Sequence, residues 1–184
     1  MSFSFNGNHI ELASEALGSS FESEANSNFV FLETHEPLSH SQESELQSYG
    51  VRFLQQLTET TWLCKYEPAD LVIIRGQAFV ANVAVVDPRH KIAPTLKAPM
   101  WARKKSEERE EKHTVHVRLH EEAGMTAHQV ARRMSEVTDV SIEEMVVQRD
   151  NTVTLDVAGQ VLLNIAKIDD VASIEKVRGE VEVS

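Results

Sequence analysis

The stretch 36-EPLSHSQESELQSYGVRFLQQL-57 contains the signals for a turn, a short helix, a helix stop and a strand. Ser39 followed by Gln42 fits a capping box, which predicts a helix over residues 40–49. Gly50 stands where many helices end in the left-handed backbone conformation that glycine adopts most easily. The run VRFLQQL after it is typical of a strand.

The neighbouring segments extend this stretch to six elements. Runs of β-branched and aromatic residues predict further strands in FVFLETH, TWLCKY and FVANVAVV. Pro68 is well placed in the first turn of a second helix, which Gly76 ends. The predicted order over residues 28–97 is therefore strand, helix, strand, strand, helix, strand.

The same order returns in residues 113–184. HTVHVRLH alternates apolar and polar residues, which predicts a half-buried strand. Thr126 and Gln129 form a second capping box, and SIEEMVVQ and TVTLDV flank the turn signal RDN. The predicted fold class is α+β, with two tandem ferredoxin-like βαββαβ units. Each unit is an antiparallel four-stranded sheet with both helices on one face.

Composition separates the remaining segments from these two domains. Residues 1–27 are rich in Ser, Asn, Gly and Glu, which predicts a disordered acidic arm. Residues 98–112 carry a mixed-charge run, which predicts a charged, solvated linker. The linker would join domain 1 (residues 28–97) to domain 2 (residues 113–184).

Charge and cysteine content exclude several classes of function. The net charge of −11 argues against nucleic acid and anionic membranes as partners. The single cysteine, Cys64, permits neither an intrachain disulfide nor a multi-cysteine metal site. No run approaches the roughly 18 apolar residues of a membrane span, and residues 1–27 do not fit a secretory signal. We therefore expect a soluble, cytoplasmic protein.

The sequence offers no convincing catalytic or metal site. His116 and His120 share one face of a predicted strand but lie four residues apart, about 13 Å, too far for one zinc ion. His113 should face the other side. Cys64 is interpreted as a packed residue, because nothing indicates a positioned base. We expect no enzyme activity, no metal and no cofactor.

Aromatic residues are the candidates for a contact surface. Each sheet has one face that its helices leave uncovered. Strand alternation places Phe29 and Phe31 on one side of their strand, and Trp62 and Tyr66 on one side of theirs. If both pairs lie away from the helices, they form an exposed aromatic interface. The alternative is that they pack against the helices or against the other unit.

The first domain resembles the N-terminal propeptide domains of subtilisin-like serine proteases. Three pieces carry the likeness: the opening strand that leads into EPLSHSQESELQSYGVRFL, the strand TTWLCKYEP before the second helix, and the closing FVANVAVVDPRHKIAP. The second domain is similar to the second propeptide-like module that some of these precursors carry. The likeness covers residues 28–184.

The resemblance implies an inhibitor, and also a folding chaperone, of a subtilisin-like protease. Propeptides of this kind lay a sheet face on two surface helices of the enzyme, where acidic residues cap the helix N-termini. Their C-terminal segment lies extended in the substrate cleft. No subtilase signature around a catalytic Asp, His or Ser occurs here, so the chain is either a precursor fragment or a separate inhibitor acting in trans. Met1 and the missing signal favour the second interpretation.

Specific roles follow from the resemblance. The cleft-binding tail would be Val181, Glu182, Val183 and Ser184, with Ser184 at the first subsite and Val181 at the fourth. The helix-capping acids would be Glu143, Glu144 and Asp150. The segment VDPRHKIAP after domain 1 is a competing candidate for the cleft. Two other functions stay open: a non-inhibitory scaffold module, and a regulatory domain that binds a small ligand.

Overall fold

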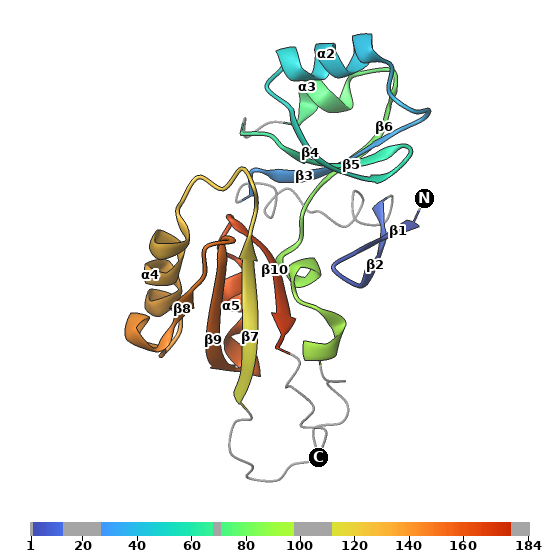
Figure 1. Cartoon of the computed structure of the whole chain (residues 1–184). Coiled ribbons are helices and arrows are strands. Elements are labelled where there is room, and N and C mark those ends of the chain that lie inside the picture. The colour runs from blue at the N-terminus through green and yellow to red at the C-terminus, as the bar shows by residue number, and fades with distance from the viewer. Residues whose placement is uncertain (1, 13–26, 68–70, 98–111, 178–184) are drawn as a thin grey trace. The chain divides into compact units, whose positions relative to one another are not determined.

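The computed structural model describes residues 2–12, 27–67, 71–97 and 112–177. The chain divides into two compact units, unit 1 (Met1–Asp87) and unit 2 (Pro88–Ser184). Each unit contains an antiparallel four-stranded sheet with helices on one face (Figure 1), so the predicted α+β class is confirmed. None of the described helices is long and apolar enough to cross a membrane.

Unit 1 follows the predicted succession of elements. They are β3 (Phe29–Thr34), α2 (His40–Ser48), β4 (Arg52–Thr58), β5 (Thr61–Lys65), α3 (Val72–Arg75) and β6 (Val80–Val85). The strands form the first sheet in the order β4-β5-β3-β6, with every pairing antiparallel. The second helix is shorter than predicted, since α3 has only one turn and residues 68–70 lie outside the described ranges.

The predicted helix signals of α2 are confirmed in detail. The Gln42 amide donates to Ser39 Oγ at 3.4 Å, and the Ser39 amide donates to Gln42 Oε1 at 2.9 Å, which completes the capping box. Gly50 adopts φ of 97°, a conformation that costs a residue with a side chain about 1 kcal/mol. The helix ends here and the chain turns into β4, while Leu46 in the last turn of α2 is fully buried against the sheet.

Unit 2 repeats the arrangement with one longer connection. Its elements are η2 (Pro88–Lys91), η3 (Pro94–Leu96), β7 (Lys112–Leu119), α4 (Ala127–Val137), η5 (Ile142–Glu144), β8 (Val146–Val147), β9 (Thr152–Ala158), η6 (Gly159–Val161), α5 (Leu162–Ala166) and β10 (Val171–Lys176). The strands form the second sheet in the order β10-β7-β9-β8. In both sheets the first of the four strands therefore lies between the third and the fourth, and the second is at an edge.

The prediction that residues 88–97 belong to domain 1 is wrong, because these residues pack into unit 2. Ile92 and Leu96 belong to the core of unit 2, and the Ala93 amide donates to the carbonyl of Ile174 in β10 at 2.9 Å. Ile92 also forms a parallel bridge with Ile174. The prolines of this segment are typical of a linker, but Ile92 and Leu96 are buried. The boundary between the units therefore follows Asp87, ten residues before the predicted end of domain 1 at residue 97.

The prediction of a disordered arm is wrong for residues 2–12. They form an antiparallel hairpin of β1 (Ser2–Phe5) and β2 (Asn8–Glu11). Asn6 and Gly7 form its turn with φ of 50° and 77°, which is the backbone that an Asn-Gly hairpin loop requires. Residues 13–26 of the predicted arm lie outside the described ranges.

The hairpin covers the face of the first sheet that the helices leave uncovered, called here the second face. On the helix face, Val30, Leu32 and Cys64 pack with Leu46 of α2 and Ile74 of α3. On the second face, apolar side chains of the hairpin and the sheet form another core: Phe3, Phe5, Ile10, Leu12, Phe29, Phe31, Leu63, Ala84 and Val86. Figure 1 shows the helices and the hairpin on opposite sides of this sheet.

Candidate functional site

The four predicted interface aromatics do not form one exposed surface. Val30 of β3 stands opposite Cys64 of β5, so Phe29 and Phe31 share a face with Lys65 and Leu63. Trp62 and Tyr66 instead belong to the helix face. Phe29, Phe31 and Tyr66 are at most 2 % exposed. The two aromatic pairs therefore lie on opposite faces, and this part of the prediction is wrong.

The second face of the first sheet is already occupied by the chain itself. The rings of Phe3 and Phe5 each contact the ring of Phe31 edge-on, with centroids 5.1 Å apart. Such aromatic pairs contribute about 0.5–1.5 kcal/mol each beyond their buried area. A partner could reach this face only by displacing the hairpin.

The second face of the second sheet has a different composition. Val115 and Val117 of β7 point into the core under the helices, so Thr114, His116 and Arg118 lie on the second face. Thr114 pairs with Asp156 and His116 with Thr154. Phe29 and Phe31 likewise lie on the second face of their sheet, in the first of its four strands. The first strand of the second sheet thus carries polar side chains on the face where that of the first sheet carries buried phenylalanines.

Hydrogen bonds join the side chains of this polar face. His116 Nδ1 and Thr154 Oγ1 are 2.8 Å apart, and Gln148 Nε2 donates to Thr154 Oγ1 at 3.0 Å. Thr114 Oγ1 donates to Asp156 Oδ1 at 2.5 Å. Glu175 of β10 stands opposite His116, and Val146 of β8 opposite Thr154, where it is 60 % exposed. The polar face is defined here as Thr114, His116, Arg118, Thr154, Asp156 and Glu175, with Val146 at its edge, and these side chains are exposed or half-buried.

The three predicted helix-capping acids lie in the connection between α4 and β9. Glu143 and Glu144 belong to η5 and Asp150 to the turn after β8, and all three are exposed. Glu144 accepts hydrogen bonds from the amide and the hydroxyl of Ser141, both at 3.0 Å. These bonds hold the pKa of the Glu144 carboxyl below its usual value, and Lys112 contributes to the same shift. Glu144 therefore already caps a turn of its own chain.

Of the two candidates for a cleft-binding segment, only VDPRHKIAP lies within the described residues. Its Lys91 is 2 % exposed, and Nζ donates to the carbonyls of Ile168 and Asp169, both at 3.2 Å. Burial lowers the pKa of Lys91 to about 8, while Asp169 and Asp170 oppose the shift. Val181, Glu182, Val183 and Ser184 lie outside the described residues.

The side chains with metal-binding or nucleophilic chemistry do not converge. No group of three His, Cys, Asp or Glu side chains within the described residues could hold one metal ion. Cys64 is buried in the helix-face core, as predicted, and burial raises the pKa of its thiol. The thiolate needed for nucleophilic chemistry is therefore disfavoured.

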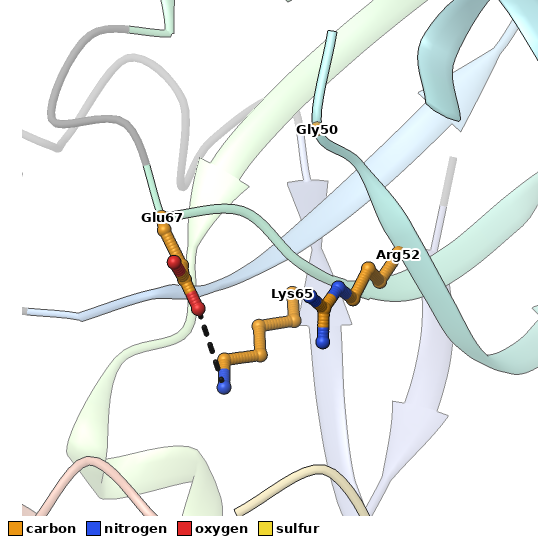
Figure 2. Close-up of a pocket in the computed structure, with 4 residues that line it drawn as sticks. All are labelled: Gly50, Arg52, Lys65 and Glu67. Carbon is orange, nitrogen blue, oxygen red and sulfur yellow. Dashed lines mark ion pairs between the residues drawn. The ribbon is translucent and has the colours of Figure 1, made fainter. Parts of the chain in front are cut away.

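Sequence reasoning missed one charged depression on unit 1, shown in Figure 2. It measures about 430 Å³ and is lined by Gly50, Arg52, Lys65 and Glu67. Lys65 Nζ lies 3.6 Å from Glu67 Oε1. Arg52 and Lys65 are direct partners across β4 and β5, a proximity that the sequence hides because it depends on strand register.

Comparisons with protein-family models, with curated proteins and with solved structures found no match for this chain.

Proposed function

We propose that the chain is a proteinaceous inhibitor that acts in trans on a subtilisin-like serine protease, with two tandem ferredoxin-like units as its scaffold. The strand order and the helix placement in both units support the scaffold part of this proposal. The resemblance of the sequence to protease propeptides supports the inhibitory part. A role as folding chaperone for the same protease belongs to this proposal.

The observation that carries the proposal is the polar face of unit 2. A propeptide-like inhibitor needs one sheet face that can receive the enzyme. In unit 1 that face is packed under the hairpin through Phe3 and Phe5. In unit 2 the corresponding face carries hydrogen-bonded polar side chains that are exposed or half-buried. We therefore assign protease contact to unit 2.

The acids of unit 2 differ in their availability to an enzyme. A carboxylate that caps a helix of the protease must be able to accept its backbone N–H groups. Glu144 already accepts two hydrogen bonds from Ser141, so it would have to exchange partners. Glu143 in the same exposed turn is the better candidate, with Asp150 after it.

The C-terminal tail is the better candidate for the cleft. Release of VDPRHKIAP would remove Ile92 from the core and break both hydrogen bonds of Lys91. Loss of one buried aliphatic side chain from a core costs about 2–5 kcal/mol. Use of the tail Val181–Ser184, which follows β10 in the sequence, would leave these contacts of Ile92 and Lys91 in place.

Inhibition assays with the full-length chain test this function. The protein is titrated into subtilisin with a chromogenic substrate, beside a variant lacking Val181–Ser184. The intact chain should inhibit, and the deletion should weaken inhibition about 100-fold, because the backbone pairing in the cleft is lost. Circular dichroism should show that the shortened chain stays folded. Equal inhibition by both proteins would refute the role of the tail, and no inhibition by either would refute the function for that enzyme.

A charge reversal tests the orientation of unit 2. Glu143→Lys should weaken inhibition about tenfold, because a cation replaces an anion at a helix N-terminus of the enzyme. Glu121→Lys is the matched control, since Glu121 is also exposed but lies in the turn after β7. Similar inhibition constants for the two variants would contradict the assignment.

A scaffold module without inhibitory activity is the second candidate. Val72 and Ile73 of α3 are 66 % and 50 % exposed, and exposed apolar side chains of this size favour contact with another protein. An affinity pull-down from the source lysate separates the two functions. Recovery of a subtilisin-like protease supports the inhibitor, whereas recovery of other proteins that is lost on Ile73→Ser supports the scaffold.

A further inference from the structure

The edge strands of the two four-stranded sheets differ in how their outer backbone groups are protected. An unpaired edge can add a strand of another chain, and proteins prevent this with bulges, charges, very short strands or a covering segment. β4 carries Arg52 and two irregularities in its register, and β8 has only two residues. At β10, the Ala93 amide donates to the carbonyl of Ile174, and Ile92 forms a parallel bridge with the same residue. These three edges are therefore protected.

β6, the fourth edge strand, has less protection of this kind. It runs over six residues, and its register irregularity lies at its beginning, where Thr34 pairs with Val80. The stretch 78-AFVANVAVV-86 contains no charged residue, although the net charge of the chain is −11. Two copies of this stretch can therefore approach each other without repulsion between directly opposite like charges.

The ladder between β3 and β6 shows which backbone groups of β6 point outward. In an antiparallel pair, opposite residues alternate between those that exchange both backbone hydrogen bonds and those that exchange none. The Val86 amide donates to the carbonyl of Phe29 at 3.0 Å, so this pair is of the first kind. By this alternation Ala84 also bonds to β3, whereas Val83 and Val85 direct their amides and carbonyls to the outer edge.

One side chain contacts this outer edge. Arg75 Nη2 donates to the Val83 carbonyl at 3.4 Å, which is longer than most hydrogen bonds of this kind. A carbonyl oxygen has two lone pairs, so it can accept a second donor. The two outward amides and the Val85 carbonyl bond to no other group of the described residues. The outer edge of β6 can therefore receive another strand.

We propose that β6 is the contact surface of a homodimer, in which the β6 strands of two copies pair antiparallel about a twofold axis. The partner strand needs outward donors and acceptors at alternate residues, and β6 itself has them without an acidic side chain. A twofold contact uses the same residues in both copies. With the axis at Ala84, Val83 of each copy lies opposite Val85 of the other, and the two pairs exchange backbone hydrogen bonds. These main-chain bonds supply the affinity, as in other cases of strand addition.

Two substitutions at Val85 test this dimer in the full-length chain. Val85→Pro removes an amide that points away from β3, so the ladder inside unit 1 keeps its hydrogen bonds. It should raise the dissociation constant of the dimer about 100-fold, measured by sedimentation equilibrium, because two symmetry-related hydrogen bonds are lost. Val85→Ala is the matched control, since it shortens the same side chain but keeps the amide, and it should leave the constant almost unchanged. Circular dichroism verifies that both variants stay folded.

Amide exchange in the wild type tests the same edge without a substitution. Deuterium exchange of the Val83 and Val85 amides, followed by NMR, should slow several-fold as the protein concentration rises through the dissociation constant. The Ala84 amide, which bonds to β3 within each copy, is the internal reference and should not change.

Three outcomes would overturn the proposal. A chain that stays monomeric, with fast exchange at Val83 and Val85 at every concentration, would refute the dimer and leave the edge to a strand of another protein. A dimer that persists in Val85→Pro, or that Val85→Ala weakens equally, would place the contact elsewhere. Protease inhibition plays no part in these measurements, so their outcome is independent of the proposed function.

Discussion

The second faces of the two sheets differ although the units share one strand order. In unit 1, Phe31 packs against Phe3 and Phe5 of the hairpin. In unit 2, His116 on the second face of β7 is half-buried and lies 2.8 Å from the Thr154 hydroxyl. The same topology thus carries an internal apolar contact in one unit and a polar surface in the other. Topology alone does not determine which face is available to a partner.

Substitution of one second-face residue in the first strand of each four-stranded sheet is the strongest test of this difference. Phe31→Ala should destabilise unit 1 by about 3–5 kcal/mol, because a fully buried aromatic side chain is lost from a core. His116→Ala should cost unit 2 about 1 kcal/mol or less, because one partly exposed hydrogen bond is lost. Urea unfolding checks both values, with Trp62 fluorescence in a Trp101→Phe background for unit 1 and NMR signals for unit 2. Similar costs would show that the hairpin does not seal the first sheet.

The second test concerns the pH dependence of unit 2 through Lys91. Its pKa of about 8 in the folded state lies below the ordinary value of 10.5, so the unfolded chain binds more protons between these pH values. The free energy of unfolding should therefore rise by about 3 kcal/mol from pH 8 to 10.5. Below pH 8 the cost of burying the charge is present in full.

The comparison of wild type with Lys91→Met isolates this effect. Urea unfolding, followed by NMR signals of unit 2, should show the pH-dependent rise in the wild type and not in the variant. Other groups that titrate above pH 8 are common to both proteins and cancel in the difference. An equal rise in both would assign the pH dependence to another group.

The hairpin turn offers a smaller test. Gly7→Ala should destabilise the hairpin by about 1 kcal/mol, because Gly7 has φ of 77° and a side chain disfavours that conformation. Trp62 fluorescence in urea should report a matching loss of stability in unit 1. Gly159 has ordinary backbone angles and open space at its Cβ, so Gly159→Ala is the control and should not destabilise the chain. Equal effects would argue against a strained turn.

The smallest effect concerns the acids that only unit 2 carries in its longer connection. Hydrogen bonds from Ser141 lower the pKa of Glu144, so its stabilising contribution is present at neutral pH and is lost as the pH falls through the lowered pKa. Ser141→Ala should raise the titration midpoint of the Glu144 carboxyl, measured by NMR. The variant keeps the amide donor of residue 141, so an unchanged midpoint would show that the Ser141 hydroxyl does not contribute to holding the Glu144 carboxylate.

The features that could be predicted from the sequence are those that depend on residues close together along the chain. The capping boxes at Ser39 and Thr126 are both present, because they join residues only three positions apart. The succession of elements in both units was predicted for the same reason. The Asn6-Gly7 turn between alternating apolar residues was also a readable local signal, but the polar composition of the first residues obscured it.

Features that depend on strand register could not be predicted. The alternation of side chains along a strand shows which residues of that strand share a face. It does not show which residues of the neighbouring strand lie on the same face of the sheet. One register, Val30 opposite Cys64, decides that Phe31 and Trp62 lie on opposite sides. The same pairing rule brings Arg52 of β4 beside Lys65 of β5.

The placement of Ile92 and Ala93 against β10 has a consequence for how the chain can be divided. The described part of unit 2 is built from two stretches of sequence, residues 88–97 and 112–177, with a run of mixed charge between them in the sequence. A cut within residues 98–111 would therefore yield fragments that remain associated through the core of unit 2. A fragment that begins at residue 113 would lack Ile92 and Leu96, and adding back a peptide of residues 88–97 should restore its stability.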